Sequence, residues 1–310
     1  MKSVRTVALL TAASTFALIV LGGIVRITGS GMGCDDDWPL CNGRLIPRFG
    51  DIATAIEYGH RVFAFALSIL VVALAFVAYR KRREAGGGAV FRLSLVAVGL
   101  LVVQVILGQI TVAMELPPTS VILHLGTAMA LLACVQLIAM QARGGASGPV
   151  GGDRRLNRSA IVAAGLGALA VLLGAVTANT GAAGACLGFP LCNGQLWPSA
   201  GAGGLAHIHW MHRLVAYALT FHLIGMAAAG RRRRMAETTK TALFWALGLT
   251  AIQVAIAAAM VLSVLQPHWR GAHVAVGTAV WMSLVVLVWR TRSRPSAVPD
   301  PAEAVPVAAA

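Results

Sequence analysis

The chain has 310 residues, of which 58% are hydrophobic and 12% are charged, and its formal net charge is +14. Soluble domains carry about 25% charged residues, so this composition excludes a soluble globular protein and indicates an integral membrane protein in a lipid bilayer. The basic residues lie in short clusters between apolar runs, which favours cytoplasmic loops over a nucleic-acid-binding surface, and we expect no nucleic-acid partner.

Eight apolar segments are long enough for a transmembrane helix, which needs about 20 residues. In chain order they are 5–26, 59–79, 92–114, 120–141, 159–179, 207–229, 241–264 and 271–290. The first exceeds a signal-peptide core and lacks an A-x-A cleavage site, so we expect it to be retained. The connections alternate in charge, and 19 of the 25 basic residues fall on one face. The positive-inside rule predicts that this face and both termini are cytoplasmic.

Four landmarks recur at a nearly constant offset, which indicates that the chain is an internal repeat. Residues 39–43 (Pro-Leu-Cys-Asn-Gly) recur letter for letter at 190–194, 151 residues later. The other pairs are His60-Arg61 with His212-Arg213, Gln104 with Gln253, and His124 with His273, at offsets of 152, 149 and 149 residues.

The repeat predicts an all-α fold of two tandem, pseudo-symmetric four-helix bundles in one orientation. The bundles are predicted at 1–143 and 159–291, with a flexible cytoplasmic linker at 144–158. The Pro- and Ala-rich residues 292–310 are expected to form a disordered cytoplasmic tail.

Each half carries two repeated histidines near the outward ends of its second and fourth helices. His60 and His124 form this pair in the first half, and His212 and His273 in the second. Two histidines at matched depth on facing helices are typical of bis-axial heme ligation, and Gly- and Ala-rich helices leave room for a macrocycle. Zinc is less favoured, because each pair supplies two strong ligands instead of four. For any single histidine, a hydrogen-bonded role at a helix end is the alternative.

Charged neighbours distinguish the two halves. Arg61 and Arg213 each follow a ligand candidate and are interpreted either as contacts to heme propionates or as interfacial arginines. Glu57 lies one turn before Arg61 and has no acidic counterpart, since His209 holds its place. A carboxylate near an iron ligand suits proton transfer. Glu57 is therefore the candidate catalytic residue, which predicts a reactive first half and an electron-transfer second half.

The remaining histidines, His207, His222 and His268, have weaker claims to a functional role. His222 lies about 15 Å deeper than His212 by helix rise and on a different face. His209 shares a face with His212, and its role is left open.

Two cysteine pairs lie in the long outward loops. Cys34 with Cys41 and Cys186 with Cys192 are close enough in sequence to form disulfides in an oxidising compartment. Two roles remain open for these pairs: structural staples for the loops, or a redox function toward the heme. Cys134 lies alone in an apolar run and is predicted to be a buried hydrophobic residue.

Taken together in order, these motifs resemble the heme A synthase family, in the bacterial branch with cysteine pairs in its outer loops. The matching segments are Gly29–Met32 with the Cys34/Cys41 loop, Glu57–Arg61, Gln104–Thr111, His124–Gly126, Pro190–Gly194, His212-Arg213 and His273. The resemblance covers residues 1 to about 290. It implies an enzyme that oxidises the C8 methyl of heme O to a formyl group by successive hydroxylations, giving heme A for terminal oxidases.

The same resemblance assigns roles to residues. It implies that His60 and His124 hold the substrate heme O, that Glu57 is the catalytic carboxylate, and that His212 and His273 ligate a permanent heme b. It further implies a bacterial plasma membrane with the heme sites near the extracytoplasmic face. Expected partners are a heme O synthase and an electron partner, either a quinone or a redox protein.

Two other functions fit the repeated histidines. A di-heme b-type quinol dehydrogenase would stack its hemes at two depths, whereas all four histidines are predicted at one. A non-enzymatic heme carrier would need neither Glu57 nor two cysteine pairs.

Overall fold

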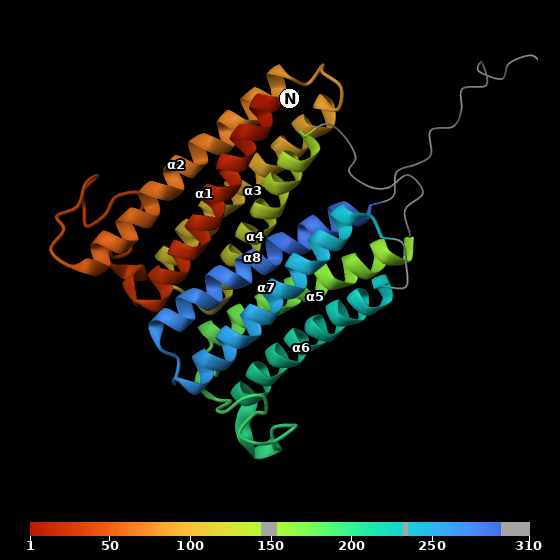
Figure 1. The fold of residues 1–310 in the computed structure, drawn as a ribbon. Helices are drawn as coiled ribbons and strands as arrows, with labels where there is room; N and C mark the ends of the chain where they lie inside the picture. The colour runs from red at the N-terminus through yellow and green to blue at the C-terminus, as the bar shows by residue number, and fades with distance from the viewer. Residues whose placement is uncertain (144–153, 232–234, 293–310) are drawn as a thin grey trace, which may run out of the picture.

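The structure is a computed structural model that describes residues 1–143, 154–231 and 235–292. Within these ranges the regular elements are helices, and eight of them are long and apolar enough to span a membrane (Figure 1). They are α1 (Lys2–Ile27), α2 (Ile52–Arg80), α3 (Gly87–Ala113), α4 (Pro118–Gln141), α5 (Arg154–Asn179), α6 (Gly203–Arg231), α7 (Glu237–Leu262) and α8 (Pro267–Thr291). This confirms the predicted all-helical membrane fold. Residues 144–153 of the predicted linker and 293–310 of the predicted tail lie outside the described ranges.

The helix α2 starts at Ile52 rather than near residue 59, because Asp51 caps it. The Asp51 carboxylate accepts the Thr54 N–H at 2.7 Å and the Thr54 hydroxyl at 2.9 Å, which satisfies a backbone donor that the first turn leaves free. These hydrogen bonds, the backbone one foremost, hold the pKa of Asp51 below its usual value. The earlier start places Glu57 inside α2 instead of in a loop before it.

Helix contacts fall into two sets of four (Figure 1). In the first set α1 and α3 each pack against α2 and α4, and in the second set α5 and α7 each pack against α6 and α8. The sets meet where α1 and α4 contact α8, and where α4 contacts α5. The helix α5 begins at Arg154, so residues 154–158, which were predicted as linker, belong to this helix.

Two side chains join the sets by hydrogen bonds to helix carbonyls. Trp281 Nε1 donates to the carbonyl of Met129 at 3.0 Å, and Gln136 Nε2 donates to that of Met282 at 3.0 Å. Both contacts lie between α4 and α8. They fix the two sets against each other at the level of these residues.

Large apolar side chains cover the outside of the helices. Phe65, Phe76 and Phe244 are 70%, 59% and 70% exposed. Such exposure is unfavourable in water and favourable against lipid tails. The distribution of apolar side chains therefore agrees with the transmembrane reading of the helices.

Candidate functional site

Each set of helices carries, at one end, a loop closed by a disulfide. Cys34 is bonded to Cys41 between α1 and α2, and Cys186 to Cys192 between α5 and α6, which confirms both predicted pairs. All four cysteines are at most 1% exposed. The free Cys134 is buried in the helices, as predicted.

The repeated Pro-Leu-Cys-Asn-Gly motif folds the same way in both loops. Asn42 and Asn193 adopt the left-handed conformation with a φ of 51°, and each is followed by a glycine that also has a positive φ. Asparagine and glycine tolerate this region at low cost. The sequence repeat is therefore a structural repeat.

A buried arginine holds the loop of the second set. Arg213 is 6% exposed and lies one position after His212 on α6. Its guanidinium donates to the backbone carbonyls of Cys186 (2.6 Å), Gly188 (2.9 Å) and Leu191 (2.8 Å). A planar guanidinium can satisfy several acceptors at once, so Arg213 fastens the disulfide loop to α6.

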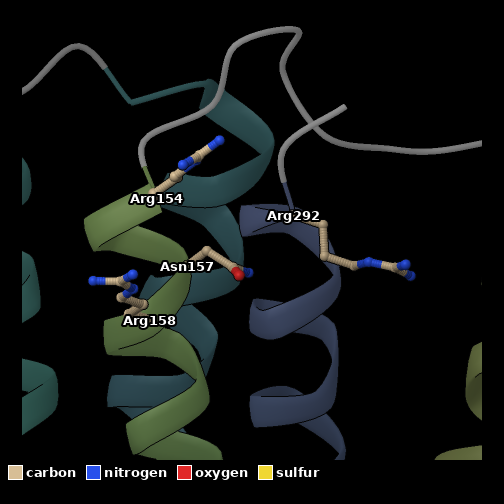
Figure 2. A pocket seen from close by; sticks show the side chains of 4 residues that line it. All are labelled: Arg154, Asn157, Arg158 and Arg292. Carbon is tan, nitrogen blue, oxygen red and sulfur yellow. The ribbon is translucent and has the colours of Figure 1, made fainter. Parts of the chain in front are cut away.

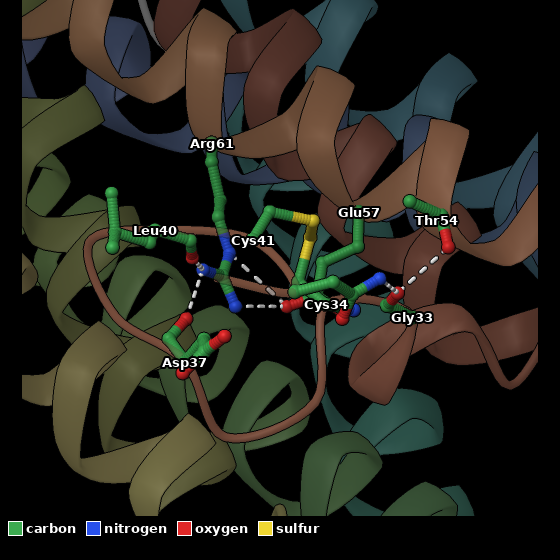
Figure 3. Close-up of polar contacts among 9 residues, drawn as sticks. Gly33, Cys34, Asp37, Leu40, Cys41, Thr54, Glu57 and Arg61 are labelled. Atoms are coloured by element: carbon green, nitrogen blue, oxygen red, sulfur yellow. Dashed lines mark hydrogen bonds and ion pairs between the residues drawn. A yellow bond between two sulfur atoms is a disulfide. The ribbon is translucent and has the colours of Figure 1, made fainter. Parts of the chain in front are cut away.

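The first set repeats this arrangement and adds a carboxylate (Figure 3). Arg61 donates to the carbonyls of Leu40 (2.7 Å) and Asp37, while its Nε and Nη2 pair with Oε1 of Glu57, with Nε–Oε1 at 3.1 Å. The other oxygen of Glu57, Oε2, accepts the N–H of Cys34 at 3.0 Å. Glu57 is 3% exposed. The carboxylate is thus a buried link between α2 and the disulfide loop.

The contacts of Arg61 and Arg213 with the loops were not predicted from the sequence. Propionate contacts or an interfacial position were the two predicted roles, whereas both guanidinium groups bind loop carbonyls in the structure. Arg61 already makes four hydrogen bonds with its five N–H groups. Contact of Arg61 or Arg213 with a propionate stays a prediction.

His209 occupies the place of Glu57 in the second set and binds a different loop group. Its Nδ1 lies 3.1 Å from the carbonyl of Ala182, so the imidazole donates where Glu57 accepts. The side chain is 5% exposed. The second set therefore keeps the arginine contact and the disulfide but has no carboxylate beside them.

The four repeated histidines lie in the first half of their helices, at the same end of the protein as the disulfide loops. Nδ1 of His60, His124 and His212 is buried without a hydrogen-bond partner among the described residues. An unsatisfied buried polar atom costs about 1–3 kcal/mol. A buried ring nitrogen without a protein partner, repeated at three matched positions, fits histidines that bind a further ligand.

The second histidine pair has the spacing that one metal ion requires. The ring centroids of His212 and His273 are 6.4 Å apart. An imidazole nitrogen lies roughly 2 Å from a metal that it ligates, so two rings on opposite sides of one ion have centroids roughly 6 Å apart. Within the described residues no group of three or more His, Cys, Asp or Glu could hold a metal ion. The pair therefore fits a heme iron, whose other ligands come from the macrocycle.

The repeated glutamines orient the helices that carry the histidines. Gln104 Nε2 donates to the carbonyl of His124 at 2.8 Å. Gln253 Nε2 donates to the carbonyl of His273 at 3.0 Å and lies 3.0 Å from its Nδ1. The glutamines therefore link α3 to α4 and α7 to α8 at the level of the histidines.

Glycines on neighbouring helices make room for the histidine rings. A Cβ at Gly22 would lie 3.3 Å from Cε1 of His60, and a Cβ at Gly174 would lie 3.0 Å from Cε1 of His212. These glycines are 152 residues apart, the same offset as the two histidines. The sequence analysis missed them, although each follows a leucine at the repeat offset and could have been found from it.

Two of the other histidines, His222 and His207, have local hydrogen-bond partners. His222 Nε2 lies 2.9 Å from the carbonyl of Ser159, and His207 Nδ1 lies 2.9 Å from that of Gly203. These contacts fasten α6 to α5 and order the start of α6. Neither side chain joins the repeated pairs.

Fold and site together define a multi-pass membrane protein with two repeated histidine pairs beneath disulfide-closed loops. Residues 5–286 match the family described as cytochrome oxidase assembly protein (COX15-CtaA), and the chain belongs to this family.

Curated relatives match most of the chain. The chain is 32% identical over 305 residues to a protein named heme A synthase from Symbiobacterium thermophilum, which covers 94% of this chain and 96% of the relative. It is 31% identical over 229 residues to a heme A synthase from Alkalihalophilus pseudofirmus, covering 72% and 75% of the two chains. A heme A synthase from Bacillus licheniformis is 27% identical over 285 residues, with 88% and 90% covered.

We expect Gly174→Ala to disturb the second histidine pair. The added methyl group lies in close contact with the His212 ring, which must shift by a few tenths of an ångström, and overpacking of this kind costs about 1–3 kcal/mol. Thermal unfolding and the ratio of bound heme to protein measure the effect. Gly165→Ala on the same helix is the control, because nothing lies within 4 Å of its added Cβ. Equal heme content in the two variants would contradict the assigned packing.

We expect Arg213→Lys to loosen the loop of the second set. Lysine carries a compact charge and cannot donate to three carbonyls in one plane. The free energy that holds the loop on α6 should therefore fall by about 2 kcal/mol or more. Hydrogen exchange of residues 186–192 should rise. Arg270→Lys at the start of α8 is the control. An equal rise in the hydrogen exchange of residues 186–192 in this control variant would show that the effect is not local.

Proposed function

We propose that this protein is a heme A synthase, an enzyme that oxidises the C8 methyl of heme O to a formyl group. Two successive hydroxylations of the methyl carbon give a geminal diol, which loses water to form the aldehyde of heme A. One observation carries this proposal beyond the family relationship. A duplicated site has a buried carboxylate beside its histidine in only one of the two halves, which is the asymmetry expected when one half does chemistry.

In this proposal the histidine pairs have separate roles. His60 and His124 hold heme O as substrate, while His212 and His273 ligate a resident heme b. The unpartnered nitrogens of His60, His124 and His212 support both assignments, and the ring spacing of His212 and His273 supports the second. Heme b supplies a one-electron redox centre. The protein contributes rigid helices and glycines that set the ring positions.

Glu57 is proposed to move protons at the substrate. A carboxylate has about four lone-pair sites, and Glu57 uses three of them, two at Oε1 for Arg61 and one at Oε2 for Cys34. The remaining site is on Oε2. Because the guanidinium and the amide fix both oxygens, Oε2 is held in one orientation, which favours proton transfer over a freely rotating acid.

The disulfides have a structural role that their contacts support. Cys34 and Cys186 each offer a backbone group to the buried network of their half. A redox role for Cys34–Cys41, the pair beside Glu57, remains a proposal, and Cys186–Cys192 has no carboxylate neighbour.

Orientation and partners follow from the charge pattern. We propose that the basic ends of the helices face the cytoplasm of a bacterium and that the histidine pairs lie near the extracytoplasmic face of its plasma membrane. A heme O synthase would supply the substrate, and a quinone or a redox protein would be the electron partner. A di-heme quinol dehydrogenase fits less well, because the four histidines lie at one end of the helices.

Substitution of Glu57 tests the catalytic proposal. Membranes from cells that express the chain with a source of heme O should contain heme A by pyridine hemochrome analysis. Glu57→Gln keeps the size of the side chain but cannot take up a proton, so heme A formation should fall about 10²–10⁴-fold while heme b is retained. Glu84→Gln, which removes a carboxylate just beyond the opposite end of α2, is the control and should retain full activity. If Glu57→Gln loses heme b together with heme A, the role of Glu57 is structural.

Substitution of the second histidine pair tests the heme b proposal. Purified His212→Ala and His273→Ala should each lack the bis-histidine heme absorbance, because one axial ligand is gone. His207→Ala, which removes a histidine at the start of α6 outside the pairs, should retain it. A bis-histidine spectrum in both ligand variants would refute the assignment.

A further inference from the structure

A cavity of about 210 Å³ lies between the two sets of helices, at the end of the protein opposite the disulfide loops. It is formed by α1, α4 and α8, near the start of α1 and the ends of the other two helices. The lining residues are Arg5, Leu9, Ala12, Gln136, Ala139, Met140, Arg143, Met282, Val286, Trp289 and Arg290. None of them belongs to the histidine site.

Each of the three helices lines the cavity with a stripe of residues spaced by three or four positions, which is one helical face. Every stripe has an arginine at or just beyond the helix end, with apolar residues one to two turns deeper. These arginines are Arg5 near the start of α1, Arg143 two residues after the end of α4, and Arg290 near the end of α8. The cavity therefore has a basic mouth and a mostly apolar wall. This is the polarity of an amphiphile with an anionic head.

The three arginines of the mouth have no acidic partner within the described ranges of the chain. Like charges gathered at one opening repel each other unless an anion lies between them. The mouth lies at the ends of membrane-spanning helices, on the face predicted to be cytoplasmic, where anionic lipid headgroups are present. Basic pockets between helices on this side bind such headgroups.

The wall below the arginines suits an alkyl chain. Leu9 is 50% exposed at the rim, whereas Ala12, Ala139 and Trp289 are at most 4% exposed. The floor is Gln136, whose Nε2 donates to the carbonyl of Met282 while its Oε1 is buried without a partner. Oε1 of Gln136 could accept a hydrogen bond from a water molecule in the cavity. This polar side chain marks the inner limit of the apolar wall.

We propose that this cavity binds one anionic phospholipid, with its phosphate among Arg5, Arg143 and Arg290 and an acyl chain along the apolar wall. A neutral quinol brings no negative charge to the three arginines, and the trimethylammonium group of a zwitterionic lipid would add a further positive charge at the mouth. The lipid contacts α1 and α4 on one side and α8 on the other. It thereby joins the two sets of helices at the end that has no disulfide.

A neighbouring pocket shows why basic residues alone do not define this site. It has a volume of about 330 Å³ and is lined by Arg154, Asn157, Arg158 and Arg292 (Figure 2). All four side chains are polar, and Figure 2 shows Arg158 and Arg292 pointing away from each other. This pocket lacks a wall for an acyl chain, so Arg154 and Arg158 provide control positions.

Native mass spectrometry of the purified full-length protein tests the proposal. After detergent exchange the protein should retain one added phosphatidylglycerol and no phosphatidylcholine. In the variant Arg5→Gln/Arg143→Gln/Arg290→Gln, phosphatidylglycerol affinity should fall on the order of 100-fold, since each arginine near an anionic headgroup contributes about a factor of five. The control Arg83→Gln/Arg154→Gln/Arg158→Gln makes the same charge change outside the cavity and should bind as the unsubstituted protein does.

A second variant separates the lipid chain from its headgroup. Ala12→Leu places a larger side chain in the cavity without changing its charge, so it should also weaken phosphatidylglycerol binding. This variant tests the proposal on its own if the triple variant does not fold. Millimolar inorganic phosphate should not displace the lipid. Equal retention of the two lipids, unchanged binding in either cavity variant, or displacement by phosphate alone would each overturn the proposal.

Discussion

The disulfide end of this protein depends on a buried guanidinium that satisfies backbone carbonyls of a loop. A non-helical segment near a bilayer leaves peptide groups without partners, and such groups are tolerated only when the protein itself satisfies them. Arg213 does this for three carbonyls of one disulfide loop. Because the arginine adjoins His212 on α6, the same contact fixes the loop above the histidine pair.

The duplicated arginine contact differs between the two halves in one of its partners. In the second half an Nη2 hydrogen of Arg213 reaches the carbonyl of Cys186, whereas in the first half the matching Nη2 pairs with Glu57. The carboxylate in turn accepts the N–H of Cys34. The loop is thus held in both halves, and a carboxylate beside the first histidine pair is added without leaving a buried charge unpaired.

Hydropathy, the internal repeat and cysteine spacing were sufficient to predict the helices, the disulfides and the end of the protein at which the histidines lie. The same signals were not sufficient to predict contacts that use backbone groups. Every residue has a backbone carbonyl, so the sequence does not indicate which carbonyl accepts a hydrogen bond. The start of α2 was placed too late for a related reason: the cap at Asp51 lies in a polar stretch that a hydropathy criterion discards. Gly22 and Gly174, in contrast, were present in the repeat and were overlooked because small residues are common in membrane helices.

The two ends of the helices are held by different physical means. At the disulfide end, covalent bonds and buried arginine contacts act within each half. Arg26 Nε also donates across the halves to Oδ1 of Asn179 at 2.8 Å. Between the halves, the side-chain hydrogen bonds of Gln136 and Trp281 both run between α4 and α8. Three arginines without acidic partners within the described ranges line one cavity beyond them. Repulsion among like charges there opposes close packing of the junction, and an anion bound among them would offset that repulsion. The lipid proposed above would therefore strengthen the junction between the halves at the end away from the histidine pairs.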